Sequence, residues 1–466
     1  MPNFGKMTLS ELIRPEGYVC ACGKVHSCPL KYLNIGRGIV EETPKLVAAM
    51  GKRRPFVVSD GNTWAVAGRR VDEVLAAAGV AHTNYVIPCT TGESGLPGMS
   101  SQRISPAEWE VGSAIMNFDP ECDMILAVGS GVVNDICKVM AKATGRPSAV
   151  VGTAPSMDGY ASNNAAMEMN HVKVSLYTSV PEGILLDTDI LAQAPMRMLW
   201  AGLGDMVAKY IAICEWRISN LITGEYYCED VAELMRAALR KIMAVSQRIP
   251  ERDPDAIAAV AEGLVLAGIG MAYAEISRPA SGLEHYFSHM WEMMALERGE
   301  PYDLHGIQVG VGTVLTMRIY EKLAEITPDR ARAEAHMRAF DPAAWKAQVR
   351  RIFGKTADQI LAIEEKVHKN DPAKHARRLE NILNHWEEIL KIMREELPDF
   401  RWLYDAMAAT GMPMEPRDID VPDGDVINAF VGARDIRDKY LSCSLIWDLG
   451  LTDEFAAFLQ ESLRQR

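Results

Sequence analysis

The sequence lacks the charge pattern of a protein that binds nucleic acids or anionic membranes. Its 49 Lys and Arg residues are outnumbered by 62 Asp and Glu residues, giving a net charge of −13 and a pI near 5.4. An acidic surface repels phosphate groups, so we expect no nucleic-acid partner, and a small anionic ligand would need a local basic pocket. The opening segment MPNFGKMTLSELIRPEG also lacks the apolar core of a signal peptide. We therefore expect a cytoplasmic protein.

A convincing transmembrane segment is missing as well. The most apolar stretch, IAAVAEGLVLAGIGMAYA at residues 257–274, contains Glu262 and three glycines and is followed directly by Glu275. It has no belt of aromatic or basic anchors for the two membrane surfaces. These features predict a helix buried in the core of a soluble domain.

Cysteine is present without the spacing of a disulfide framework or a zinc knuckle. The nine cysteines are an odd number with no regular pattern, which is typical of a reduced cytoplasmic protein. One stretch, CACGKVHSC, brings Cys20, Cys22, His26 and Cys28 together. These residues could bind a structural zinc ion, but CxC differs from the usual CxxC spacing. The interpretation that we favour is a glycine-containing turn with reduced thiols that the chemistry does not need.

The length of 466 residues predicts two main domains. Between about residues 30 and 190, the apolar runs RPFVVSD, NYVIP, MILAVG and SAVVGT alternate with helix-like stretches such as GRRVDEVLAAAG. This alternation predicts a Rossmann-like parallel sheet covered by helices. After about residue 192, apolar residues recur every three or four positions, which predicts an all-α domain. We expect an extension at residues 1–34, an α/β dinucleotide-binding domain at 35–192 and an all-helical metal- and substrate-binding domain at 193–466.

The stretch MILAVGSGVVNDICKVMAK, which reads as strand, turn and helix, is a candidate phosphate-binding site. Gly129 and Gly131 leave room for phosphate oxygens at a helix N-terminus. The motif is not GxGxxG, since Asn134 and Asp135 stand where the third glycine would come, and a tight turn explains it equally well. Asp60, at the end of PFVVSD, could bind a ribose hydroxyl, although such an acid normally follows the glycine turn. The loop GTAPSMDGYAS adds hydroxyl groups after the next strand, or is an ordinary turn.

Candidate metal ligands occur in the second half of the chain. In SRPASGLEHYFSHMWEM, His285 and His289 lie four positions apart and so share one helix face. His305 in YDLHGIQVGVG and Asp205 in AGLGDMVAKY complete a set of side chains that suits a catalytic divalent metal. The spacing is not that of a local motif such as HExxH, and ten histidines produce such pairs by chance. The residues alone leave a metal site and ordinary core histidines both open.

The order of these motifs resembles that of a known family. GSGVVND, TAPSMDGYAS, AGLGDMVAKY, SRPASGLEH and HGIQVGVGT follow one another as in the sn-glycerol-1-phosphate dehydrogenases. These enzymes belong to the superfamily of iron-type alcohol dehydrogenases, glycerol dehydrogenase and dehydroquinate synthase. The resemblance runs from about residue 30 to RDKYLSCSLIWDLGL and is strongest to bacterial members. It implies a dehydroquinate synthase-like fold, in which the acid on the first strand precedes the glycine turn.

The resemblance also implies roles for individual residues. Asp205, His285 and His305 would bind the metal. Asp158 and His289 would contact the substrate, so that Asp158, Asp205 and His289 form the catalytic group. The nicotinamide nucleotide would be bound by Asp60, Gly129, Ser130, Gly131, Val132, Val133, Asn134, Asp135, Thr153, Ala154, Pro155, Ser156 and Ser162.

A phosphorylated substrate would need a cation, and two are near the predicted ligands in sequence. Lys209 lies one turn after Asp205, and Arg278 lies two turns before His285, so both could bind substrate together with Asp158, Asp205 and His289. The alternatives are that Lys209 neutralises its neighbouring carboxylate and that Arg278 forms a structural ion pair.

The implied reaction is the reversible reduction of dihydroxyacetone phosphate to sn-glycerol 1-phosphate by NADH or NADPH. A divalent metal (zinc, nickel or iron) would act as a Lewis acid on the carbonyl oxygen. Asp60 would repel a 2′-phosphate, which predicts a preference for NADH. We expect a homodimer or a higher homo-oligomer. The alternatives are a dehydrogenase of another polyol or polyol phosphate, a dehydroquinate synthase-like lyase, and a non-catalytic nucleotide-binding protein.

Overall fold

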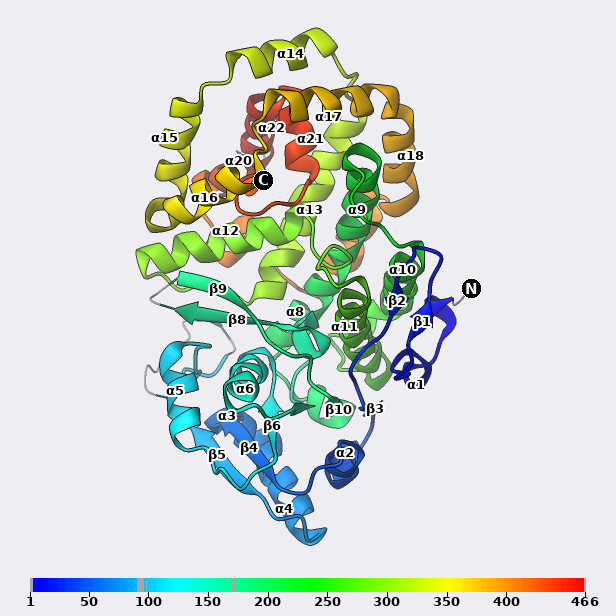
Figure 1. Cartoon of the computed structure of the whole chain (residues 1–466), viewed down its shortest axis with the longest axis vertical. Helices are drawn as coiled ribbons and strands as arrows, with labels where there is room; N and C mark the ends of the chain where they lie inside the picture. Colours follow the sequence, from blue (N-terminus) through cyan, green and yellow to red (C-terminus); the bar gives the residue numbers. More distant parts are fainter. Residues whose placement is uncertain (1–2, 90–95, 98, 170–171, 465–466) are drawn as a thin grey trace.

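A six-stranded parallel sheet forms the first half of the molecule (Figure 1). The computed structural model describes residues 3–89, 96–97, 99–169 and 172–464. The strands are β3 (Tyr32–Gly36), β4 (Pro55–Asp60), β5 (Thr83–Ile87), β6 (Met124–Gly129), β7 (Ser148–Gly152) and β10 (Gly183–Asp187), in the spatial order β3-β10-β7-β6-β4-β5. The central strands are buried along their whole length, which explains why the sequence shows unbroken apolar runs instead of alternation.

The chain reverses its direction of travel across the sheet between β4 and β6. From β4 it adds β5 on one side, whereas β6, β7 and β10 follow one another on the other side. In open parallel sheets, ligands bind beyond the carboxyl ends of the strands at such a switch point. The ends of these two strands are Asp60 and Gly129, both predicted to bind the nucleotide.

Helices cover both faces of the sheet. They are α2 (Thr43–Ala49), α4 (Arg69–Ala77), α5 (Glu108–Met116) and α6 (Gly131–Thr144). Residues on alternate positions of a strand enter different cores: Val57 and Leu126 join a small core with Val71 of α4, whereas Phe56 and Ile125 join the large core that continues into the helical half. The two halves therefore share one core.

An antiparallel hairpin interrupts the parallel pattern between β7 and β10. It consists of β8 (Asn164–Met169) and β9 (Val172–Tyr177), and β9 packs against the helical half. This hairpin was not among the elements predicted from the sequence. It is important for the site because it carries Lys173 to an acid on α12.

The second half is helical from Thr188 onward, apart from turns and loops, in the part of the chain that the structure describes. Its helices are α7 (Thr188–Leu191), α8 (Met196–Val207), α9 (Lys209–Thr223), α10 (Glu229–Met243), α11 (Pro254–Ala274), α12 (Leu283–Arg298), α13 (His305–Ala324), α14 (Arg330–Ala339), α15 (Pro342–Phe353), α16 (Ala357–Val367), α17 (Pro372–Asn384), α18 (Trp386–Glu396), α19 (Phe400–Ala408), α20 (Asp423–Ala433), α21 (Ser442–Asp448) and α22 (Thr452–Arg464). The predicted fold class, an α/β half followed by a helical half, is confirmed.

Helix α11 is the one described helix that is long and apolar enough to cross a membrane, and 78% of its most apolar window is buried inside the protein. The prediction of a buried core helix at residues 257–274 is therefore confirmed. The N-terminal segment packs beside it: α1 (Leu9–Leu12) and the hairpin of β1 (Tyr18–Val19) and β2 (Val25–His26) lie next to α10 and α11 (Figure 1). The segment thus packs against the helical half, and the boundary that we predicted at residue 34 falls inside β3.

Candidate active site

Glycines allow three helices of the second half to approach one another closely. A Cβ atom on Gly204 of α8 would lie 2.1 Å from the carbonyl oxygen of Gly306, and one on Gly306 of α13 would lie 2.0 Å from that of Ala201. A Cβ atom on Gly312 of α13 would lie 2.5 Å from the carbonyl oxygen of Glu284 in α12. Larger residues at these positions would force the helices apart. The glycines therefore bring together the three helices that carry the predicted metal ligands.

Asp205, on α8, is fully buried beside a buried cation. Lys209 Nζ donates to Asp205 Oδ1 at 2.9 Å and to Asp158 Oδ2 at 2.7 Å, and the Asp158 N–H donates to Asp205 Oδ2 at 2.9 Å. Burial alone would raise the pKa of Asp205, but Lys209 and His285 lower it below its usual range. Burial alone would lower the pKa of Lys209, but the two carboxylates raise it above its usual range. Asp205 and Lys209 are therefore both charged at neutral pH.

His285, on α12, lies between two acids. Its Nδ1 is 2.8 Å from Glu284 Oε1, and its Nε2 is 3.4 Å from Asp205 Oδ1. Because Nδ1–H donates a hydrogen bond to Glu284, Nε2 is the ring nitrogen that faces Asp205. Burial alone would lower the pKa of His285, but Asp205 and Glu284 raise it. Asp158, Asp205 and His285 each offer a ligand atom within 4.8 Å of the others.

His305 begins α13 and lies beside both histidines of α12. Its ring centroid is 5.4 Å from that of His285 and 5.3 Å from that of His289. Its Nδ1 is 2.9 Å from Ser288 Oγ and 3.4 Å from Glu292 Oε1, which leaves Nε2 as the nitrogen available to an ion. His289, Glu292 and His305 form a second group whose ligand atoms lie within 4.8 Å of one another.

Glu292 is a charged residue of this centre that the sequence analysis missed. It is buried on α12 and forms an ion pair with Lys173 of β9. Burial alone would raise the pKa of Glu292, but Lys173 lowers it well below its usual range. Burial lowers the pKa of His289 well below its usual range, and Arg437 adds to this effect. His289 is therefore neutral at neutral pH. The position of Glu292, three residues after His289 on the same helix face, is the signal that could have identified it.

The donor set fits a divalent metal ion. One carboxylate and two imidazoles from three helices are ligands that zinc and other first-row metals accept. Each imidazole has an acid or a hydroxyl group at Nδ1, the arrangement that fixes metal-binding histidines. In this structure His305 groups with His289 and Glu292 rather than directly with Asp205. The assignment of Asp205, His285 and His305 as ligands therefore stays a prediction.

The residues predicted to bind the nucleotide line the switch point of the sheet. Asp60 ends β4, and its Oδ1 accepts the N–H of Thr63 at 2.7 Å. Gly129 ends β6, where a Cβ atom would lie 2.5 Å from Val133 Cβ, so this glycine is needed for packing rather than for phosphate. A Cβ atom on Gly131 would meet Met157 Cγ at 3.2 Å. Gly131 is the first residue of α6, whose N-terminus with Val132 and Val133 is a favourable place for a pyrophosphate.

The hydroxyl-rich loop after β7 folds back onto this helix. Ser130 Oγ lies 2.7 Å from Ser156 Oγ and donates to Ala154 O at 3.2 Å, and the N–H of Thr153 donates to Gly129 O at 3.2 Å. A Cβ atom on Gly202 of α8 would lie 1.9 Å from the carbonyl oxygen of Pro155. This loop, residues 152–162, which we predict to bind the nucleotide and call the nucleotide loop, therefore touches the helix that carries Asp205.

A buried lysine that the sequence analysis missed fixes the next part of the loop. Lys138 Nζ, on α6, donates to Asp135 Oδ1 at 3.1 Å, Gly159 O at 2.6 Å, Ser162 Oγ at 3.2 Å and Asn164 O at 2.9 Å. Asn134, predicted with Asp135 and Ser162 to bind the nucleotide, also donates to Gly159 O, at 3.3 Å. The contacts of Asp135 and Ser162 are thus internal ones that shape the loop around Asp158.

The contacts of Arg278 favour the alternative that this residue forms a structural ion pair and does not bind substrate. Its Nε and Nη2 donate to Glu225 at 2.6–2.9 Å, and Nη2 donates to Tyr440 O at 2.8 Å. A different cation lies near His289, which is predicted to contact the substrate. Arg437 is exposed, its charge lowers the pKa of His289, and it contacts Ser175 Oγ at 3.4 Å. Arg437 is therefore better placed than Arg278 to meet a phosphate group.

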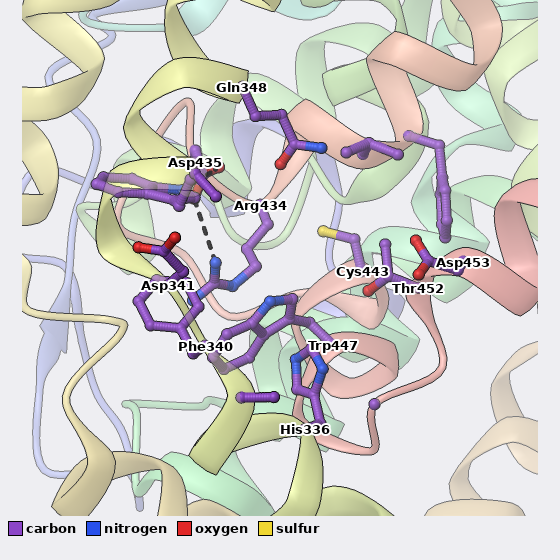
Figure 2. A pocket seen from close by; sticks show the side chains of 16 residues that line it. His336, Phe340, Asp341, Gln348, Arg434, Asp435, Cys443, Trp447, Thr452 and Asp453 are labelled. Atoms are coloured by element: carbon purple, nitrogen blue, oxygen red, sulfur yellow. Dashed lines mark hydrogen bonds and ion pairs between the residues drawn. The ribbon is translucent and has the colours of Figure 1, made fainter.

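Two cavities in the helical half lie apart from these residues. One, of about 350 Å³, is lined by His336, Phe340 and Trp447 around the guanidinium of Arg434 (Figure 2). Arg434 lies over the Trp447 ring, 3.7 Å from its centroid, and pairs with Asp435. A second cavity, of about 510 Å³, shares Arg434. None of the predicted site residues lines either cavity, so we place the active site at the switch point and the three helices instead.

Comparison with known proteins agrees with the fold and with the motifs. The sequence profile of the iron-containing alcohol dehydrogenases matches residues 34–195. Glycerol dehydrogenase from Schizosaccharomyces pombe has the same fold, with a TM-score of 0.59 at 16% identity over 95% of this chain and 93% of that one. The α/β half thus has the fold of the iron-containing alcohol dehydrogenases.

Closer relatives specify the family. A glycerol-1-phosphate dehydrogenase [NAD(P)+] from Halalkalibacterium halodurans is 32% identical over 306 residues, which cover 66% of this chain and 74% of the relative. Another, from Bacillus licheniformis, is 29% identical over 434 residues, which cover 93% and 92% of the two chains. This chain belongs to the glycerol-1-phosphate dehydrogenase family.

Proposed function

We propose that the protein catalyses the NAD(P)-dependent, metal-dependent interconversion of dihydroxyacetone phosphate and sn-glycerol 1-phosphate. The relatives named above are glycerol-1-phosphate dehydrogenases [NAD(P)+], which supports this substrate and cofactor. The observation in this structure that supports it best is that three closely packed helices carry Asp205, His285 and His305, with the His285 and His305 ring centroids 5.4 Å apart. The nucleotide loop and α8 are in direct contact, so a nicotinamide bound at the switch point would lie beside this centre.

The metal and the nucleotide would supply the chemistry that side chains lack. A divalent ion held by Asp205, His285 and His305 would polarise the C2 carbonyl of the ketone, and the nicotinamide would deliver hydride to C2. Glu284 and Ser288 hold the two imidazoles with their Nε2 atoms directed inward. These residues orient the ligands before substrate arrives, which reduces the reorganisation needed during the reaction.

Proton delivery is the role that we propose for His289. It is neutral because of its burial, and it lies one turn from His285 beside His305. A neutral imidazole can hold a water molecule by hydrogen bonding; this water would donate a proton to the C2 oxygen as the alcohol forms, and the hydroxide left behind would take a proton from solvent. Lys209 keeps the carboxylates of Asp158 and Asp205 together, so that Asp158 can contact a substrate hydroxyl group.

The phosphate group requires a cation in an acidic protein. We propose Arg437 for this role, because it is exposed, its charge lowers the pKa of His289, and its contact to Ser175 Oγ is long, at 3.4 Å. A charge-assisted contact contributes about 1.5–3 kcal/mol, so Arg437→Gln should raise KM for the phosphorylated ketone about 10- to 150-fold. KM for free dihydroxyacetone should change little. Equal effects on both ketones would contradict this assignment.

The test of the function is a panel of ketones and ketose phosphates with NADH, using protein loaded with zinc, nickel or iron. We expect oxidation of NADH with dihydroxyacetone phosphate at a higher kcat/KM than with dihydroxyacetone, and a preference for NADH because of Asp60. Product formation without net NADH consumption would indicate a lyase that returns the hydride. Another ketone as the best substrate would indicate a different polyol dehydrogenase, and a lack of turnover with every metal would contradict an enzymatic role.

We further propose that the protein is cytoplasmic and works as a homodimer or a higher homo-oligomer. The free thiols of all nine cysteines support a reducing compartment. Light scattering coupled to gel filtration measures the assembly, and a mass of 51.4 kDa would show a monomer instead.

A further inference from the structure

Three cysteines and one histidine form a cluster that is separate from the candidate active site. They are Cys20, Cys22 and His26 of the N-terminal hairpin and Cys228, which directly precedes α10. All four ligand atoms lie within 4.8 Å of one another. Cys28, which the sequence placed in this group, is not part of it; the fourth member comes from more than 200 positions further along the chain. We propose that these four side chains bind a structural zinc ion.

The distances within the cluster match a tetrahedral zinc site. Cys20 Sγ and Cys228 Sγ are 3.6 Å apart, and His26 Nε2 is 3.3 Å from Cys22 Sγ and 3.4 Å from Cys228 Sγ. Zinc bonds of ~2.3 Å to sulfur and ~2.0 Å to nitrogen give tetrahedral edges of ~3.8 Å between two sulfurs and ~3.5 Å between sulfur and nitrogen. An ion at the centre would therefore need shifts of only about 0.2 Å along these edges.

The histidine is already oriented for a metal. His26 is buried, and its Nδ1 lies 2.7 Å from the carbonyl oxygen of Tyr273. A carbonyl oxygen can only accept, so Nδ1 carries a proton and Nε2 is the ring nitrogen that faces the sulfurs. The same second contact orients imidazoles in known metal sites. The His26 ring also stacks on Tyr273, with centroids 5.5 Å apart, and makes an edge-to-face contact with Phe4.

The hairpin fixes the two N-terminal cysteines. β1 and β2 pair Tyr18 with His26, and the turn between them is closed by the Cys20 N–H donating to Lys24 O at 3.0 Å. Gly23 has a φ of 87°, a backbone conformation that a larger residue rarely adopts. The turn allows the N–H of Cys22 to donate to Cys20 Sγ at 3.5 Å. The CxCG turn thus brings two cysteine side chains close together, as a CxxC turn does in other zinc sites.

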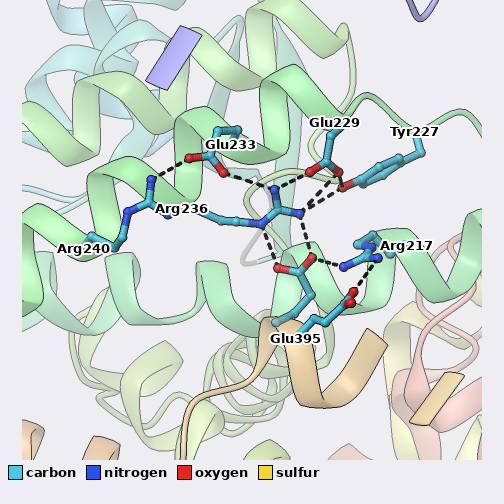
Figure 3. A network of polar contacts seen from close by, with 8 residues as sticks. Arg217, Tyr227, Glu229, Glu233, Arg236, Arg240 and Glu395 are labelled. Carbon is cyan, nitrogen blue, oxygen red and sulfur yellow. Dashed lines mark hydrogen bonds and ion pairs between the residues drawn. The ribbon is translucent and has the colours of Figure 1, made fainter. Parts of the chain in front are cut away.

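A separate network fixes Cys228. The residues on either side of it, Tyr227 and Glu229, both bond to Arg236, which also binds Glu396 of α18 (Figure 3). Arg236 is largely buried among these partners. Cys228 is therefore held in place by contacts that do not involve the cluster. The site is built from two independently anchored pieces of chain.

The chemistry of the set points to a structural role. Four protein ligands leave no open coordination position, and three thiolates with one imidazole suit zinc. Binding releases the thiol protons to solvent, and one existing bond must break, because Asp230 Oδ2 now lies 3.2 Å from Cys20 Sγ. The ion would fasten the N-terminal hairpin to the start of α10 and so connect two segments that are distant in sequence.

The test is metal content of the full-length protein purified in reducing buffer, measured by mass spectrometry for wild type, Cys22→Ser, Cys228→Ser and His285→Ala. The matched control is Cys28→Ser, a buried cysteine of the same segment outside the cluster. We expect one tightly bound zinc per chain that is lost in Cys22→Ser and Cys228→Ser and kept in Cys28→Ser and His285→Ala. Zinc retained in Cys22→Ser, or a wild type whose bound metal is lost entirely in His285→Ala, would overturn the proposal.

A second measurement does not depend on how well the variants fold. Cobalt bound by three thiolates absorbs strongly in the near ultraviolet through sulfur-to-metal charge transfer, whereas an Asp/His site does not. Wild-type protein reconstituted with cobalt should show this absorption, and so should Cys28→Ser. Its absence in wild type, or a disulfide between Cys20 and Cys228 found by mass spectrometry after reducing purification, would overturn the proposal. The result is independent of whether the reaction proposed above is correct.

Discussion

Lys138 gives the most quantitative test of how the loop around Asp158 is held. In Lys138→Met the ammonium group is lost, and Asp135, Gly159 O and Asn164 O each lose a partner in a buried setting. Breaking a buried ion pair by removing one member costs about 3–5 kcal/mol. We expect a loss of about this size in the free energy of unfolding, measured by urea denaturation at pH 7.5.

The pH dependence of this loss follows from Asp135. Burial already raises the pKa of Asp135, and Lys138 opposes that rise. Without Lys138 the pKa of the folded state rises further above the ordinary value of about 3.9, so the folded state binds more protons than the unfolded state within that window. Stability of the variant should therefore fall, relative to wild type, as pH increases from about 4 to neutrality.

Two further variants make the test specific. Lys142→Met, one turn along the same helix, removes an exposed lysine with a single contact to Tyr177 O, and should cost less than about 1 kcal/mol. Asp135→Asn combined with Lys138→Met should recover part of the loss and remove the pH dependence. A Lys138→Met protein within about 1 kcal/mol of wild type at pH 7.5, with no gain at pH 5, would refute the argument.

Three other changes test the site. Gly306→Ala should lower the free energy of unfolding by about 1–3 kcal/mol or more and should also reduce the amount of bound metal, because its Cβ would clash with a backbone oxygen of α8. An unchanged metal content would contradict the packing argument. Gly131→Val should raise the cofactor KM several-fold before it affects the unfolding temperature; an unchanged KM would remove Gly131 from the nucleotide site. His289→Ala should keep the metal and lower kcat by about 100-fold or more, whereas loss of metal would make His289 a ligand.

Much of the fold could be predicted because the buried strands consist of consecutive apolar residues, which are visible in the sequence. PFVVSD and MILAVG became β4 and β6, and the helix-forming stretch that starts at Gly131 became α6. The hairpin of β8 and β9 was not predicted, because its strands NAAMEM and VKVSLY mix polar and apolar residues and lie between the sheet and α12. Propensity and periodicity do not indicate where such a ribbon packs.

Residues of the candidate site could be predicted where they belong to a recognisable motif. Asp205, His285 and His305 were identified in that way, and the structure brings their helices together. Lys138, Lys173 and Cys228 could not be identified, since each acts through a partner that is distant in sequence or on a loop whose path the sequence does not fix. Local spacing suggested Cys28 for the cluster, but folding brings Cys228 to it instead.

The most direct test of the central claim is the stereochemistry of the product. Dihydroxyacetone phosphate and NADH are incubated with the metal-loaded protein, and the glycerol phosphate formed is analysed on a chiral column or with an enzyme specific for sn-glycerol 3-phosphate. The proposed function predicts delivery of hydride to one face of the C2 carbonyl and sn-glycerol 1-phosphate as the product. Formation of sn-glycerol 3-phosphate, or of a racemic mixture, would contradict the account.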